Sequence, residues 1–181
     1  MPDQEFTLLG DACWLDFVNT TCGRAAAPPD LLPDPAAYHR WSKAGKLVSD
    51  VDAVPFEEVL AFRRRLLGLA EALAVGRPAP APAIAAINAV LAAEGGRERL
   101  VRGSGVWRRS FAPDRAATAR IAVARSAADT LTDATRHVRR CAGDPCSLFF
   151  LDGSPTQSRR WCSAAHCGGR GRIERRRGLL R

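Results

Sequence analysis

Four cysteines near the end of the chain constrain its fold more than any other feature. They form two pairs, Cys141 with Cys146 and Cys162 with Cys167, and each pair encloses four residues. Two cysteines on one turn can present both sulfurs to one ion, and two such turns complete a tetrahedral shell. The segment is too short to build an apolar core of its own. We therefore predict that these four thiolates bind one structural zinc ion.

Other roles for the cysteines are burial as small apolar residues, disulfides, or a redox couple. Unrelated buried cysteines rarely form two equally spaced pairs, and a reducing cytoplasm disfavours disulfides. His166 lies between the last two cysteines and could replace one ligand, but four thiolates already fill the shell. A closed shell offers no open position for water, so the zinc would not be catalytic. Cys13 and Cys22 stand alone, and we expect both to be small buried residues.

Positive charge is concentrated in the same part of the chain. The net charge is +8. Residues 1–135 hold 16 basic and 16 acidic side chains, whereas residues 136–181 hold 11 arginines and three acids. A neutral body with a basic end is typical of proteins that bind nucleic acid, because guanidinium groups bind phosphates and guanine edges. The arginines that we expect to contact DNA are Arg159, Arg160, Arg170, Arg172, Arg175, Arg176 and Arg177.

The residues after the last cysteine predict a basic helix. Arg172, Arg175 and Arg176 lie at positions i, i+3 and i+4, so a helix would present them together. Two other functions stay open for this tail. It could be a protein-interaction module that meets an acidic partner, or a thiol redox sensor that releases its metal on oxidation.

The fold class that we predict is mainly α. A helical domain over residues 1–136 would carry a small β-hairpin, and a finger over residues 137–181 would consist of a β-hairpin followed by a helix. Apolar residues spaced by three and four indicate the clearest helix. After a strand or turn to Gly10, the first expected helix runs through Leu15, Phe17 and Val18. The other expected helices cover residues 35–44, 56–75, 84–93 and 114–139. We also expect a proline-rich loop at 25–36, a linker at 77–83, a hairpin at 98–111, and in the tail a strand at 148–151 that returns at 160–161.

Several functional classes lack support in the sequence. The N-terminus has no basic region of a signal peptide, and no apolar run reaches the length of about 18 residues that spans a membrane. We therefore expect a cytoplasmic protein without a membrane partner. The three histidines are scattered, and neither a nucleophile elbow nor a phosphate-binding glycine loop is present. We expect no enzyme activity.

The tail resembles the CGNR-type zinc finger, a bacterial module with four cysteine ligands. The matching residues are Arg140 and Cys141, Cys146, Leu148 to Asp152, Ser154, Arg159 to Ser163, and Cys167 to Arg170. The signature asparagine of that finger is Gly169 here. Zinc binding does not depend on this position, whereas an asparagine side chain could cap the following helix or touch a phosphate.

The first part of the chain resembles the ABATE domain, which accompanies this finger in stress-induced transcription regulators. The matching residues are Leu15 to Thr20, a proline-rich loop, and Trp41 close to Gly45. The two resemblances together imply a DNA-binding transcription regulator with a C-terminal DNA reader. They also imply an N-terminal sensing or regulatory domain, and a role for Arg160 and Arg170. We expect that domain to act through a small-molecule ligand or a homodimer contact.

Two polar residues of the Leu15 to Thr20 stretch allow a sharper expectation. Asp16 and Asn19 lie three apart, so both could project from one helix into a ligand pocket. Alternatively, they cap the helix or brace it against the proline-rich loop, and we favour this structural role.

Overall fold

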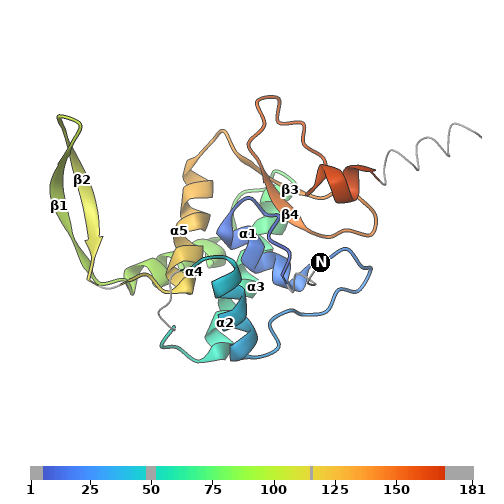
Figure 1. The fold of residues 1–181 in the computed structure, drawn as a ribbon, viewed down its shortest axis with the longest axis horizontal. Coiled ribbons are helices and arrows are strands. Elements are labelled where there is room, and N and C mark those ends of the chain that lie inside the picture. Colours follow the sequence, from blue (N-terminus) through green and yellow to red (C-terminus); the bar gives the residue numbers. More distant parts are fainter. Residues whose placement is uncertain (1–5, 48–51, 115, 170–181) are drawn as a thin grey trace, which may run out of the picture.

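A computed structural model describes residues 6–47, 52–114 and 116–169 of the chain (Figure 1). It confirms the mainly helical fold class, with two small β-hairpins and a C-terminal four-cysteine segment. No helix in these ranges is long and apolar enough to cross a membrane. The helices are α1 (Cys13–Val18), the 3-10 turn η1 (Asn19–Thr21), α2 (Pro35–Ala44), α3 (Phe56–Ala74), α4 (Ala81–Ala92), α5 (Ala119–Thr132) and the π-helical turn η2 (Ala164–Gly168).

Local sequence explains where the helices begin. Asp34 caps α2, because its Oδ1 accepts the N–H of Ala37 at 2.7 Å, and Pro35 fits the first turn. Thr118 caps α5 by accepting the N–H of Ile121 at 3.4 Å. The helix α4 begins three residues earlier than predicted, within the expected linker, because a proline is tolerated in a first turn.

The helices enclose one apolar core. Trp14 and Phe17 of α1 are fully buried, and the Phe17 ring lies 5.0 Å from the ring of Trp41 on α2. Leu66 and Leu69 of α3 pack in the same core. Because α1 contacts both α3 and α5, this six-residue helix lies at the centre of the domain (Figure 1).

The helix predicted over residues 114–139 is wrong at both ends. It covers only Ala119–Thr132, and residues 137–140 form a strand. Asp133 ends the helix, since its carboxylate accepts the N–H of Thr135 at 2.9 Å. Val138 then turns its side chain into the core as part of that strand.

Two antiparallel hairpins complete the fold. The strands β1 (Gly96–Gly103) and β2 (Val106–Pro113) confirm the hairpin expected at 98–111. In the tail, β3 (His137–Arg140) pairs with β4 (Phe149–Asp152). The expected pairing of the 148–151 strand with residues 160–161 is therefore wrong, because β4 pairs with β3 and the carbonyl of Arg160 accepts the N–H of Ala142 instead.

Candidate metal centre

Four cysteine sulfurs converge beside β4. The Sγ atoms of Cys141, Cys146, Cys162 and Cys167 all lie within 4.8 Å of one another, and all four residues are buried. The Sγ of Cys162 lies 3.8 Å from that of Cys146 and 3.7 Å from that of Cys167. Four Zn–S bonds of about 2.3 Å in a tetrahedron place the sulfurs about 3.8 Å apart. The sulfur spacing therefore fits, and the four cysteines are positioned to bind one zinc ion.

Backbone hydrogen bonds shape the first cysteine pair and tie it to the second. Cys141 follows β3, and its N–H donates to the carbonyl of Leu148 at 2.8 Å. The N–H of Cys146 donates to the carbonyl of Gly143 at 2.6 Å, which closes the turn. The N–H of Cys162 donates to the Sγ of Cys141 at 3.4 Å, so the two pairs are joined directly.

The turn η2 holds the last cysteine. The N–H of Cys167 donates to the carbonyl of Ser163 at 3.0 Å. His166 is exposed, and its Nδ1 lies 3.1 Å from the Ser163 hydroxyl. Among the described residues, His166 is not in the group that could hold a metal ion. This arrangement agrees with the expectation that thiolates alone fill the shell.

The electrostatics of the cluster call for a cation. Burial, and then the negative charge of Cys141, raises the pKa of Cys146 to about 11. Burial and the charges of Cys146 and Cys141 also raise the pKa of Cys162. Burial alone would raise the pKa of Cys141, but N–H groups of Cys162 and Gly143 lower it below its ordinary value. Since buried thiolates repel one another, a dication is what allows all of them to ionise together.

The other two cysteines lie in the helical part. Cys13 and Cys22 are half-buried and pack against the apolar core, and Cys22 also contacts the cysteine cluster. Burial, and then the charge of Asp16, raises the pKa of Cys13 to about 12. Cys13 is therefore a thiol at neutral pH and behaves as a small apolar residue.

Arg159 is half-buried, and its guanidinium is bonded within the finger. Its Nη2 donates to the carbonyl of Cys162 at 2.6 Å, and its guanidinium lies 4.4 Å from the centre of the Phe150 ring. It also forms an ion pair with Asp11 of the helical part. These contacts use the guanidinium to hold the third cysteine in place.

Arg160 differs from its neighbour, because it is exposed and lies 5.5 Å from the centre of the Trp161 ring. Trp161 packs against the cysteine cluster. The other five arginines expected to contact DNA, and the basic helix that would carry them, lie outside the described residues: Arg170, Arg172, Arg175, Arg176 and Arg177.

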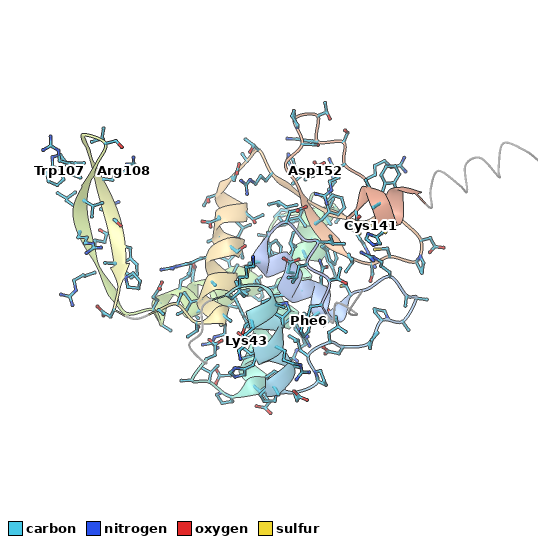
Figure 2. The ribbon with its side chains drawn as sticks, in the orientation of Figure 1. Phe6, Lys43, Trp107, Arg108, Cys141 and Asp152 are labelled. Atoms are coloured by element: carbon cyan, nitrogen blue, oxygen red, sulfur yellow. The ribbon has the colours of Figure 1, made fainter. Side chains whose placement is uncertain are left out.

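Asp152 organises the loop between the two cysteine pairs, a role that the sequence did not indicate. Its buried carboxylate accepts the hydroxyl of Ser154 at 2.6 Å, the Nε of Arg139 at 2.9 Å and the backbone N–H of Arg159 at 3.1 Å. Burial opposes ionisation, but the hydrogen bonds from Ser154 and Arg139 prevail and lower the pKa of Asp152 to about 2. Figure 2 shows Asp152 in the same region as Cys141.

Three residues of the helical part hold β4 through hydrogen bonds, and we call Gly10, Asp16 and Asn19 the β4 clamp. The Nδ2 of Asn19 donates to the carbonyl of Phe149 at 2.8 Å, while the N–H of Phe149 donates to the Oδ1 of Asn19 at 2.9 Å. Asn19 therefore pairs with the strand backbone as another strand would. The expected structural role of Asn19 is correct, but its partner is β4 and not the proline-rich loop.

In the second half of the β4 clamp, Gly10 links β4 to Asp16 through two hydrogen bonds of its backbone. The N–H of Leu151 donates to the carbonyl of Gly10 at 2.8 Å, and the N–H of Gly10 donates to the Oδ1 of Asp16 at 2.8 Å. A Cβ on Gly10 would lie only 2.7 Å from the Cβ of Leu15, so this close approach requires glycine. One carboxylate in α1 thus fixes the peptide on which β4 rests.

The packing of β4 joins the two parts of the molecule. Phe149 and Leu151 face the core of the helical part, whereas Leu148 and Phe150 pack against the cysteines. Successive side chains of a strand point to opposite faces, so β4 is covered on both. The finger and the helical part therefore share one buried strand.

Comparisons with known proteins agree with this architecture. A family model named ABATE, described as a "Putative stress-induced transcription regulator", matches residues 11–134. A second family model, the CGNR zinc finger, matches residues 137–178. No curated protein matches the chain. Since the first match covers more than half of the chain, the protein belongs to the ABATE family, and it carries a CGNR zinc finger at its C-terminal end.

Proposed function

We propose that the protein is a cytoplasmic, zinc-dependent transcription regulator that binds DNA. Residues 137–181 form the reading finger, and residues 1–136 regulate it. The observation that carries this proposal is the charge distribution, with 11 arginines against three acids in residues 136–181. A neutral body with a basic, zinc-stabilised end is the charge pattern expected of a protein that binds nucleic acid.

The arginines divide into two roles in this proposal. Arg159 braces the finger, because its guanidinium is already bonded within it. Arg160 is exposed and contacts the phosphate backbone. The remaining contacts come from Arg170, Arg172, Arg175, Arg176 and Arg177, whose guanidinium groups bind phosphates and base edges.

A salt titration tests the proposal. The zinc-loaded chain should bind mixed-sequence duplex DNA with an affinity that falls steeply as salt rises. Each phosphate contact contributes about 0.9 to the slope of log affinity against log salt, so Arg175→Ala with Arg176→Ala should flatten it by about 1.8. The matched control is Arg64→Ala with Arg65→Ala, which removes two exposed arginines of α3. A flat slope for the parent chain would exclude DNA as the partner and favour an acidic protein.

A further inference from the structure

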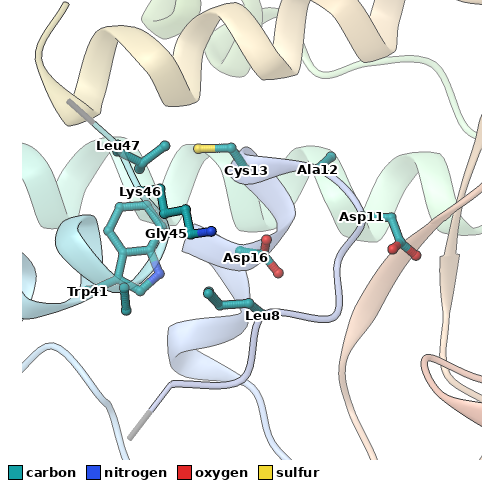
Figure 3. Close-up of a pocket in the computed structure, with 10 residues that line it drawn as sticks. Leu8, Asp11, Ala12, Cys13, Asp16, Trp41, Gly45, Lys46 and Leu47 are labelled. Atoms are coloured by element: carbon teal, nitrogen blue, oxygen red, sulfur yellow. The ribbon is translucent and has the colours of Figure 1, made fainter. Parts of the chain in front are cut away.

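A cavity of about 380 Å³ opens beside α1, next to the β4 clamp (Figure 3). Its walls come from α1, from the segment before it, and from the end of α2. Most of the lining is apolar, and includes Leu8, Ala12 and Leu47. The charged and polar side chains are those of Asp11, Asp16, Trp41 and Lys46, and Cys13 adds a thiol.

Trp41 brings an unsatisfied donor to this cavity. Its side chain is 1% exposed, and its Nε1 has no hydrogen-bond partner. Figure 3 shows the indole nitrogen on the ring edge that faces Leu8 and Asp16. A buried N–H without a partner is costly, so its presence beside a cavity indicates a hydrogen-bond acceptor from outside the chain.

The acceptors of the cavity already have partners, in contrast to this donor. Asp16 accepts the N–H of Gly10, and Asp11 pairs with Arg159. Lys46 adds a positive charge at the same site. The chemistry that the cavity lacks is therefore an anionic acceptor on an apolar body.

We propose that this cavity binds a small organic acid. The carboxylate accepts the N–H of Trp41 and faces the ammonium of Lys46, while the apolar body fills the space along Leu8 and Leu47. The volume suits a molecule the size of an aromatic or short aliphatic carboxylic acid.

The position of the cavity gives such a ligand two routes to the finger, and this consequence rests on the proposed function. Asp16 lines the cavity and holds Gly10, which receives the N–H of Leu151 in β4. Asp11 also lines the cavity and pairs with Arg159, which braces the third cysteine. A bound acid that displaces either carboxylate alters the support of the zinc site.

Calorimetric titration of the zinc-loaded full chain, without DNA, tests the site. Benzoate and hexanoate should bind, and benzylammonium, which matches benzoate in shape but not in charge, should not. Lys46→Gln and Trp41→Phe should each weaken benzoate binding about tenfold or more, since each removes a donor to a charged acceptor. The controls are Lys43→Gln and Trp107→Phe, which change exposed residues outside the cavity.

Three results would overturn this inference. These are failure of both acids to bind below a concentration on the order of 10 mM, tighter binding of benzylammonium, and unchanged binding in both Lys46→Gln and Trp41→Phe. Because Lys46 is exposed, its variant tests the site even if Trp41→Phe disturbs the core. Binding of acids without any DNA binding would support the cavity and refute the proposed function separately.

The ribbon formed by β1 and β2 carries a second inference, from an independent observation. It extends away from the helices at the opposite end of the molecule from the finger (Figure 1). Leu100 and Trp107 are 70% and 62% exposed, although both are large and apolar. Figure 2 shows Trp107 and Arg108 near the tip of the ribbon.

The strand register divides the ribbon into two faces. Residues paired across the strands share a face, so Arg102 lies beside Trp107, and Val101 lies beside Arg108. Residues 96–113 hold five arginines and one glutamate. One face presents Arg97, Arg99 and Arg108, and the other presents Leu100, Trp107 and Phe111 with Arg102, Arg109 and Glu98.

We infer that this ribbon is a second contact for duplex nucleic acid, which extends the proposed function. A two-stranded β-ribbon fits the major groove, where arginines reach phosphates and an exposed tryptophan makes apolar contacts. A second copy of the chain suits the ribbon less well, because it would bring two sets of five arginines together.

The test is DNA binding by the Arg99→Ala, Arg108→Ala double variant. We expect its salt slope to flatten by about 1.8, while the variant Arg64→Ala with Arg65→Ala keeps the parent slope. An unchanged slope in a parent that does bind DNA would overturn the ribbon contact and leave the proposed function intact. Sedimentation equilibrium adds a second readout, since a dimer that Trp107→Ala dissociates would assign the ribbon to a second copy instead.

Discussion

The two hairpins of this protein have the same antiparallel pairing and opposite surroundings. The strands β1 and β2 have eight residues each, and their large apolar side chains are exposed. The strand β4 has four residues, and all four are buried. The longer hairpin is thus the more exposed one. Strand pairing depends on the residues of the hairpin itself, whereas burial depends on what the rest of the chain packs against it.

The cause of this difference is what lies against each face. The helical core covers one face of β4 and the cysteine cluster covers the other. In Figure 1 the β1–β2 ribbon stands clear of the helices. A hairpin exposed on both faces is marginal in water, so side chains such as Trp107 gain more from a partner than from the fold.

Zinc removal should have the largest effect on the difference between the two hairpins, because it disrupts the cysteine cluster that covers one face of β4. Zinc contributes about 10 kcal/mol or more to the folding of small metal modules. Chelation, or Cys162→Ser, should abolish the hydrogen-exchange protection of Phe149 and Leu151 and lower the melting temperature of the whole chain. Amides of the ribbon should be unaffected. Cys13→Ser is the control, and full protection of β4 after chelation would refute the structural role of the metal.

Asn19→Ala should have the next largest effect. It leaves the N–H and the carbonyl of Phe149 without partners in a buried strand, which should cost about 3 kcal/mol of unfolding free energy. Denaturant unfolding would measure the cost. Asn88→Ala, at an exposed position of α4, should cost less than about 0.5 kcal/mol. Equal costs for the two variants would show that the β4 clamp does not support the strand.

The pH dependence of stability tests the other arm of the β4 clamp. The pKa of Asp16 is about 6, above the ordinary value of about 3.9, because of burial. The folded chain therefore retains a proton that the unfolded chain releases between about pH 4 and 6. Stability should fall as pH rises through this window, by about 2 kcal/mol relative to Asp16→Asn. Because both chains have the same zinc ligands, the pH dependence of zinc binding cancels in the difference between their unfolding free energies. A difference that does not change with pH would contradict the raised pKa of Asp16.

The smallest expected effect comes from comparing one buried valine with one exposed valine. Val138 of β3 is buried and Val106 of β2 is 61% exposed. Val138→Ala should cost about 2 kcal/mol of unfolding free energy, whereas Val106→Ala should cost less than about 0.5 kcal/mol. Chemical denaturation of both variants measures the difference. A large cost for Val106→Ala would mean that the ribbon is covered in solution, as it would be in a dimer.

Sequence patterns predicted the features that depend on neighbouring residues. The cysteine spacing identified the metal cluster, and a Gly-Ser-Gly turn identified the ribbon. The strand β3 was missed, because Thr135 and Val138 continue the apolar spacing of α5 and only β4 distinguishes strand from helix there. The bond of Asn19 to Phe149 joins residues 130 positions apart, and no local pattern contains it.

The net charge of the N-terminal part was misleading, because it was summed over too long a segment. Residues 1–135 sum to zero, which conceals five arginines against one glutamate within residues 96–113. Summing charge over each predicted hairpin would have revealed the basic ribbon. The cavity left a weaker signal, since Trp41 reads as a core residue and its unsatisfied N–H is visible only in three dimensions.

The shared strand also limits how such proteins can be recombined. A finger expressed alone from the start of β3 would expose Phe149 and Leu151 to water. This exposed apolar surface would favour aggregation over independent folding. Fusing the finger to an unrelated domain would fail unless that domain had an apolar surface that fits β4 and a side-chain amide that bonds Phe149 as Asn19 does. The two halves of this chain are therefore fitted to each other through β4, although separate family models match residues 11–134 and 137–178.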